Sequence, residues 1–114
     1  MTPLVSVIIP TFRRSDFITR AIDSVLAQSY NNIEVIVVDD NNNDEFRARL
    51  EELMLPFLKD IRVKYIQHES NRGLPSARNS GIRMARGEFV AFLDDDDVWF
   101  PEKLEKQISI FQEL

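Results

Sequence analysis

The chain contains no cysteine. Without thiols it forms no disulfide, carries no thiolate nucleophile and builds no zinc–thiolate cluster, so it is compatible with a reducing compartment. No apolar run is as long as a membrane span. The N-terminus also lacks a basic leader followed by a long apolar segment. We therefore expect a cytoplasmic protein, either free or held peripherally at the inner face of a membrane.

Positive charge is scarce as well. Fourteen Lys and Arg against nineteen Asp and Glu give a formal net charge of −5, which argues against a nucleic-acid-binding protein. Repeats and low-complexity segments are absent, and the composition, 44% hydrophobic and 29% charged, is typical of a folded globular protein. At 114 residues we expect a single domain over residues 1–114.

What is present is an alternation of apolar runs with amphipathic stripes. The apolar runs predict strands at residues 4–10, 33–39, 62–67 and 88–93. The stripes predict helices at residues 16–28, 45–58 with a break at Pro56, 75–85, and a last one with Pro101 in its first turn. Strand and helix alternate throughout, which predicts an α/β fold with three α/β/α layers and a mainly parallel, Rossmann-like sheet.

Two helix starts have candidate caps. Ser15 is expected to cap the first predicted helix, and Asp44 the second.

Four consecutive aspartates, Asp94 to Asp97, follow the last predicted strand. Carboxylates this close repel one another unless they are protonated, hydrated or bridged by a cation, and Mg²⁺ and Mn²⁺ prefer oxygen ligands. The alternative is a solvated acidic loop that caps the next turn. Ligands bind at the carboxyl ends of strands in open α/β sheets, which favours a metal site.

Two other polar loops follow predicted strands. They are Thr11-Phe12-Arg13 and the segment from Asp39 to Asp44. In a parallel sheet the three loops lie along one rim, and loops placed by a rigid scaffold commonly carry function.

Three segments resemble a known family: VSVIIPTFRR, VIVVDDNNND and NRGLPSARNSGIRMARGEFVAFLDDDDVWFPEKL. They are similar, from Val5 to about Leu104, to the nucleotide-sugar-binding half of inverting glycosyltransferases of family 2, which have the GT-A fold. The resemblance implies transfer of a sugar from a nucleoside-diphosphate sugar, with a UDP-sugar as donor, to a saccharide or lipid-linked acceptor. It also implies Mn²⁺ or Mg²⁺, which would neutralise charge on the diphosphate leaving group.

The resemblance assigns roles to the aspartates. Asp94-Asp95-Asp96 corresponds to the family's aspartate-any-aspartate motif, with Asp96 as metal ligand and Asp94 or Asp95 contacting ribose or metal-bound water. Asp39 and Asp40 lie in the base-binding region, where one carboxylate accepts a hydrogen bond from uracil N3–H while its neighbour fixes the loop. Here Asn41 replaces the family's more common glycine, and Asn tolerates the positive φ of a tight turn.

The remaining candidates for nucleotide-sugar binding are Pro10, Thr11, Phe12, Arg13, Gly73 and Arg78. Thr11 and Phe12 are placed to flank a base, although Phe12 suits the core equally well. Gly73 permits close backbone approach, and Arg78 pairs either with the nucleotide or with the aspartates. His68 has no partner nearby in the sequence and is expected at the surface.

Other functions remain open. The string VAFLDDDDV also fits haloacid-dehalogenase-like phosphatases, but the 17 residues after Asp97 are too few for that machinery. A non-catalytic nucleotide- or metal-binding module stays possible. The acceptor half and the catalytic base are expected beyond Leu114, so we interpret the chain as a truncated GT-A sheet. The surface left by the missing half is a candidate for self-association.

Overall fold

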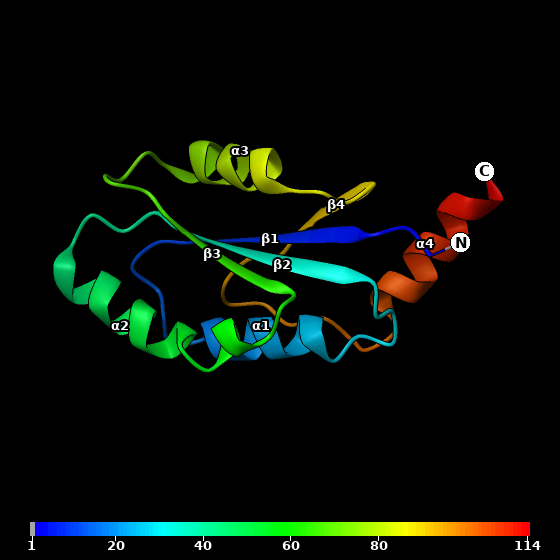
Figure 1. Cartoon of the computed structure of the whole chain (residues 1–114), viewed down its shortest axis with the longest axis horizontal. Helices are drawn as coiled ribbons and strands as arrows, with labels where there is room; N and C mark the ends of the chain where they lie inside the picture. Colours follow the sequence, from blue (N-terminus) through cyan, green and yellow to red (C-terminus); the bar gives the residue numbers. More distant parts are fainter. Residues whose placement is uncertain (1) are drawn as a thin grey trace.

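The computed structural model describes residues 2–114 (Figure 1). The elements, in chain order, are β1 (Val5–Thr11), α1 (Ile18–Leu26), β2 (Ile33–Asp39), α2 (Asp44–Met54), a 3-10 helix (Phe57–Lys59), β3 (Val63–Gln67), α3 (Leu74–Met84), β4 (Phe89–Phe92) and α4 (Lys103–Glu113). The predicted order of strands and helices is confirmed. The break expected at Pro56 separates α2 from the 3-10 helix.

The four strands form one parallel sheet in the order β3-β2-β1-β4. Every residue of β1 and β2 is buried, because helices cover the two central strands on both faces. Their Val- and Ile-rich sequences suit this position, since branched side chains pack well on a pleated surface. The chain adds β2 and β3 on one side of β1 and then returns to place β4 on the other.

Helices lie on both faces of the sheet. Figure 1 shows α3 on one face and α1 and α2 on the opposite face. Alternate residues of β1 point to different cores: Val7 packs with the buried residues of α1, whereas Ile8 packs with Ala77 of α3. The α/β fold with three layers is therefore confirmed.

Three predicted helix starts are wrong. Ser15 does not cap α1: Phe17 is the N-cap residue, and the Ser15 hydroxyl accepts a hydrogen bond from Arg49 Nε at 3.0 Å. Asp44 does not cap α2, because the Asn43 side chain already accepts from the backbone N–H groups of residues 45 and 46. Pro101 lies two residues before the start of α4 rather than in its first turn.

A buried carboxylate ties the amino-terminal end of the sheet together. Glu34 on β2 accepts hydrogen bonds from the Ser6 hydroxyl, from Lys64 Nζ at 2.8 Å and from the Arg86 backbone N–H at 2.6 Å. Burial raises the pKa of Glu34, but these hydrogen bonds outweigh it and leave the pKa below its ordinary value. This group lies at the sheet end opposite to the loops predicted to bind ligands.

Within residues 2–114, no helix is long and apolar enough to cross a membrane.

Candidate functional site

A cleft of about 370 Å³ opens at the carboxyl end of the sheet. It lies where β1 and β4 meet, and this is the point at which strand order reverses. In open α/β sheets such a switch point is the usual ligand site, because the loops of neighbouring strands diverge there. The lining residues come from the ends of β1, β2 and β4 and from the start of α3: Pro10, Thr11, Phe12, Arg14, Asp40, Asn71, Gly73, Leu74, Ala77, Asp94 and Asp95.

The loop after β1 is held on two sides. The Thr11 hydroxyl lies 2.9 Å from Asp95 Oδ2, as its donor, and 3.0 Å from the Arg14 carbonyl oxygen. The Arg13 backbone N–H donates to Asn41 Oδ1 at 2.6 Å, and Arg13 itself has a φ of 61°, which is unusual for a residue with a side chain. Consequently Arg14, and not Arg13, turns into the cleft.

We call Asp39 and Asp40 the β2 corner. Asp39 is fully buried and does not line the cleft. Its Oδ1 accepts from the backbone N–H and the side-chain amide of Asn41, while its Oδ2 accepts from the Tyr65 hydroxyl and lies 3.6 Å from Arg47 Nε. Burial and the hydrogen bond to Asp39 raise the pKa of Tyr65, so the phenol keeps its proton and serves as donor. Asp39 therefore fixes the loop.

Asp40 is also buried, at 2% exposure, but it lines the cleft. Its Oδ1 accepts from the Arg72 backbone N–H at 2.9 Å, and its Oδ2 accepts from the Gly73 N–H and the Asn71 side chain, both at 2.9 Å. Gly73 has a φ of 92°, which glycine adopts readily, and it precedes α3 as its N-cap residue. Asp40 thus holds the segment of residues 71–73 against the end of β2.

His68 is buried at 5% exposure, so the prediction of a surface residue is wrong. Its Nδ1 lies 2.8 Å from Asp40 Oδ1 and its Nε2 lies 2.7 Å from the Ser80 hydroxyl. These partners are 28 and 12 residues away along the chain, and the fold alone brings them together.

We call residues Asp94 to Asp97, after β4, the acidic loop. Within it Asp95 is buried at 3% exposure, and its Oδ1 has no hydrogen-bond partner. Burial raises the pKa of Asp95, and the neighbouring carboxylates act in the same direction, against the Thr11 hydrogen bond and the Arg14 charge. A buried carboxylate oxygen that has no hydrogen bond, and only an ion pair with Arg14 at 3.5 Å, is a group that a further cation would stabilise.

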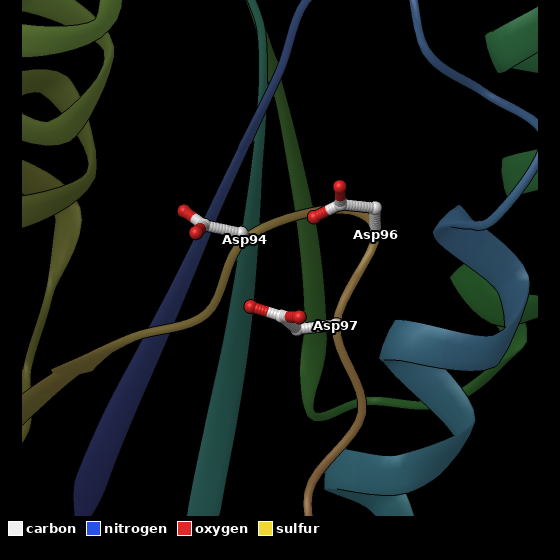
Figure 2. A group of neighbouring side chains, drawn as sticks. All are labelled: Asp94, Asp96 and Asp97. Atoms are coloured by element: carbon white, nitrogen blue, oxygen red, sulfur yellow. The ribbon is translucent and has the colours of Figure 1, made fainter.

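The other three carboxylates of the acidic loop are exposed and gather in one place (Figure 2). Asp94, Asp96 and Asp97 each offer an oxygen, and these oxygens lie within 4.8 Å of one another. The donor set is oxygen only, which fits Mg²⁺ or Mn²⁺. The nearest positive charge is Arg14, with Nη1 at 3.0 Å from Asp96 and Nη2 at 3.5 Å from Asp95.

Seven of the predicted binding residues line the cleft, namely Pro10, Thr11, Phe12, Asp40, Gly73, Asp94 and Asp95. Asp39, Arg13 and Asp96 do not line it, although each is next in the chain to a residue that does. Arg78 does not line the cleft: its guanidinium carbon lies 5.6 Å from the centre of the Phe92 ring, and its buried Nε has no hydrogen-bond partner.

Sequence reasoning missed Arg14, His68 and Asn71. Arg14 and Asn71 lie inside segments that carried the family resemblance, as the last residue of VSVIIPTFRR and the first of NRGLPSARN, whereas His68 lies outside all of them.

The Asn41 turn also differs from the prediction. Among residues 2–114, positive φ occurs only at Arg13 and Gly73, so Asn41 does not use the left-handed conformation. Its side chain instead bonds to Asp39 and to the Arg13 backbone.

Named proteins resemble this chain over nearly its whole length. The glucosyltransferase WfgD of Escherichia coli, described as UDP-Glc:alpha-D-GlcNAc-diphosphoundecaprenol beta-1,3-glucosyltransferase, is 41% identical over 107 residues, which cover 94% of this chain and 40% of WfgD. The uncharacterized glycosyltransferase RP339 of Rickettsia prowazekii is 42% identical over 113 residues, 99% of this chain and 33% of RP339. The chain thus spans less than half the length of these relatives.

Solved structures show the same fold. TarS 1-349 of S. aureus in complex with UDP-GlcNAc superposes with a TM-score of 0.80 at 33% identity, covering 96% of this chain and 31% of that one. The mannosyltransferase PcManGT of Pyrobaculum calidifontis, in complex with GDP-Man and Mn²⁺, gives a TM-score of 0.74 at 29% identity, covering 87% and 29%.

The family model described as Glycosyl transferase family 2 matches residues 6–114. This match leaves the phosphatase alternative without support. The cleft at the switch point, the aspartates around it and the relatives agree, and the chain belongs to glycosyltransferase family 2.

Proposed function

We propose that this chain is the donor-binding part of an inverting glycosyltransferase that takes a sugar from a UDP-sugar. The observation that carries the proposal is the cleft, which has the buried Asp40 on one side and the acidic loop on the other. A nucleoside needs fixed acceptors and a flat apolar surface, and a diphosphate needs positive charge. WfgD, by its name, uses UDP-Glc, and TarS was solved with UDP-GlcNAc, which supports UDP as the nucleotide.

The nucleoside is proposed to lie against the ends of β1 and β2. Asp40 lines the cleft, and its carboxylate would accept the uracil N3–H in place of the Asn71 side-chain amide that now donates to Oδ2, while Thr11 and Phe12 flank the ring. Asp39 has the supporting role, since it does not line the cleft and its oxygens contact Asn41, Tyr65 and Arg47. The same loop therefore contains one carboxylate for the base and one for its own structure.

The diphosphate is proposed to lie at the acidic loop with Mn²⁺ or Mg²⁺. Asp96 would be the metal ligand, with Asp94 and Asp97 beside it, because their oxygens lie within 4.8 Å of one another. When bound, the cation would neutralise charge that develops on the leaving diphosphate. The PcManGT structure, which contains GDP-Man and Mn²⁺, supports a metal-assisted donor site.

Acceptor binding and proton removal are proposed to involve residues outside these 114. An inverting transfer needs a base that takes the proton of the acceptor hydroxyl as it attacks the anomeric carbon. The relatives are longer than this chain, with 40% of WfgD and 33% of RP339 covered, so they have room for such a region. The name of WfgD includes a diphosphoundecaprenol acceptor, which supports a lipid-linked acceptor and a peripheral position at the membrane.

Calorimetry with UDP tests the proposal. We expect UDP to bind about tenfold more tightly with Mn²⁺ than with a chelator, since one charge-assisted contact is worth roughly 1.5 kcal/mol or more. CMP and GDP are the controls for the base. Equal UDP affinity in Mn²⁺ and in chelator would contradict the metal role, and a preference for GDP would contradict UDP as donor nucleotide.

A further inference from the structure

We propose that His68 is a positioning residue for nucleotide recognition. It orients the Asp40 carboxylate, and through it the segment of residues 71–73, at the wall of the cleft. The inference rests on the proposed function, because the contact between Asp40 and the base belongs to that proposal. Neither the acidic loop nor the metal takes part in it.

The imidazole ring bridges two elements behind the cleft. His68 follows β3, and its Nδ1 lies 2.8 Å from Asp40 Oδ1 at the end of β2. On the other side its Nε2 lies 2.7 Å from the hydroxyl of Ser80, which is in α3. His68, Asp40 and Ser80 are all buried, at 5%, 2% and 8% exposure, so water does not compete for these contacts.

The hydrogen-bond partners determine which nitrogen carries the proton. Both oxygens of Asp40 already accept N–H groups from the segment of residues 71–73, so Asp40 acts as an acceptor and His68 Nδ1 donates to it. With the ring proton on Nδ1, Nε2 is the acceptor for the Ser80 hydroxyl. The Ser80 oxygen is free to accept in turn from Arg83 Nη2, at 3.1 Å. The Nδ1–H tautomer therefore gives a hydrogen-bond partner to every group in the series Arg83, Ser80, His68 and Asp40.

The backbone of His68 is equally constrained. Its N–H donates to the Asp39 carbonyl oxygen at 2.9 Å, and its own carbonyl oxygen accepts from Arg47 Nη2. Arg47 also donates to the carbonyl oxygen of Asn41, in the loop after β2. With main chain and ring both held, His68 gives Asp40 a fixed neighbour rather than a mobile one.

A fixed Asp40 matters because a carboxylate recognises a base N–H only from a defined direction. Supporting hydrogen bonds that lock a binding side chain before the ligand arrives reduce the ordering cost of binding. Asp40 also holds the backbone of Arg72 and Gly73, and Gly73 lines the cleft. Loss of the His68 contact therefore disturbs a carboxylate and a wall of the same pocket.

Two substitutions separate the two sides of the ring. In His68→Asn the side-chain amide replaces Nδ1, so the bond to Asp40 is kept and the bond to Ser80 is lost. In His68→Gln the longer amide reaches the position of Nε2, so Ser80 keeps its partner and Asp40 loses one. Ser80→Ala is the matched control, because it removes the far contact and leaves the ring facing Asp40.

The measurement is the affinity of the 114-residue chain for uridine, UDP and inorganic pyrophosphate with Mn²⁺. We expect His68→Gln to lower the affinity for uridine and for UDP about tenfold, which is the size of one lost hydrogen bond to a charged group. The affinity for pyrophosphate should not change. His68→Asn and Ser80→Ala should stay within about twofold of the parent. A purely structural role would not separate uridine from pyrophosphate or rescue binding with asparagine.

The outcomes distinguish this inference from the function on which it rests. If the parent chain binds neither uridine nor UDP, the proposed function is wrong. If the parent binds them and folded His68→Gln binds uridine equally well, only the role of His68 is wrong. If His68→Gln does not fold, two-bond ¹H–¹⁵N NMR of the parent imidazole decides: an Nδ1–H ring supports the proposal, and an Nε2–H ring overturns it.

Discussion

The β2 corner and the acidic loop both place aspartates at the same cleft, but their surroundings differ. Asp39 and Asp40 are buried, and protein donors approach both oxygens of each. In the acidic loop three of the four carboxylates are exposed, and the buried one, Asp95, has an oxygen without a hydrogen bond. A carboxylate with its donors in place has a fixed orientation before any ligand binds. The acidic loop has fewer donors, from Thr11 to Asp95 and from Arg14 to Asp96, so it gains more from an added cation.

The largest expected effect is on stability, and it tests whether the buried β2 corner contributes more to folding than the exposed acidic loop. Asp39→Ala leaves the Tyr65 hydroxyl without its buried acceptor and Arg47 without the carboxylate of its ion pair, and breaking a buried charge pair on one side costs about 3 kcal/mol or more. Asp96→Ala, the matched change in the acidic loop, removes an exposed pair with Arg14 and should cost well under 1 kcal/mol. Urea unfolding followed by circular dichroism measures both. Similar costs would mean that the two regions are not built differently.

A second test asks whether the two regions recognise different parts of the donor. Asp40→Ala should lower the affinity for uridine about tenfold, and that for UDP by a similar factor, because it removes an acceptor for the base. Asp96→Asn should leave uridine unchanged and remove most of the gain that Mn²⁺ gives to UDP. Titrations of both variants with uridine and with UDP, with and without Mn²⁺, measure the contrast. Parallel losses in the two variants would contradict the division of roles.

Much of the fold could be predicted because its signals are local. The run IEVIVVD predicted β2 at residues 33–39, and the structure has it there, since seven buried residues in a row with many branched side chains suit a central parallel strand. The strand order, and with it the switch point between β1 and β4, is seen only in the structure. The helix starts were less predictable: residues 41–44 contain four polar side chains able to cap α2, and backbone geometry selected Asn43.

The parts of the site that were missed depend on contacts between distant residues. His68 finds Asp40 and Ser80 only after β3 has paired with β2 and α3 has packed on the sheet. The sequence also did not indicate which of the adjacent residues Arg13 and Arg14 contacts the aspartates. The left-handed conformation at Arg13, which carries its N–H to Asn41, turns Arg14 rather than Arg13 toward the aspartates.

That position of Arg14 leads to a third prediction. Its guanidinium is the cation beside Asp95 and Asp96 when no metal is bound, so it should compete with a divalent ion for the same negative charge. We expect Arg14→Gln to bind Mn²⁺ about threefold more tightly than the parent in the absence of nucleotide, a modest effect because Arg14 is exposed.

Titration of free Mn²⁺ by electron paramagnetic resonance measures this affinity. Arg20→Gln changes the net charge equally, and the Arg20 guanidinium lies over the Phe17 ring rather than at the acidic loop, so it serves as the control. Weaker Mn²⁺ binding in Arg14→Gln would show that Arg14 supports the metal site instead of competing with it.

The smallest expected effect compares two carboxylates whose pKa values move in opposite directions. The pKa of Glu34 is lowered in the folded state: burial raises it, but hydrogen bonds from Arg86, Lys64 and Ser6 outweigh burial. Ionised Glu34 therefore contributes stability above its ordinary value of 4.5, and that contribution is lost as the pH falls through the folded pKa. Glu34→Gln should thus destabilise the chain at pH 7 and lose this effect in acid.

The pKa of Asp95 moves in the opposite direction, upward. Burial, with help from Asp96 and Asp94, raises its folded pKa above 3.8, so its ionised form costs stability, and the cost disappears as the pH falls below that value. Asp95→Asn, whose amide oxygen still accepts from Thr11, should stabilise the chain by about 1 kcal/mol or less at pH 7 and by nothing near pH 3.5. Urea unfolding of both variants in chelator, from pH 7 down to pH 3.5, measures the two trends. If Asp95→Asn is destabilising at pH 7, the Thr11 and Arg14 contacts outweigh burial, and the acidic loop does not lack a cation.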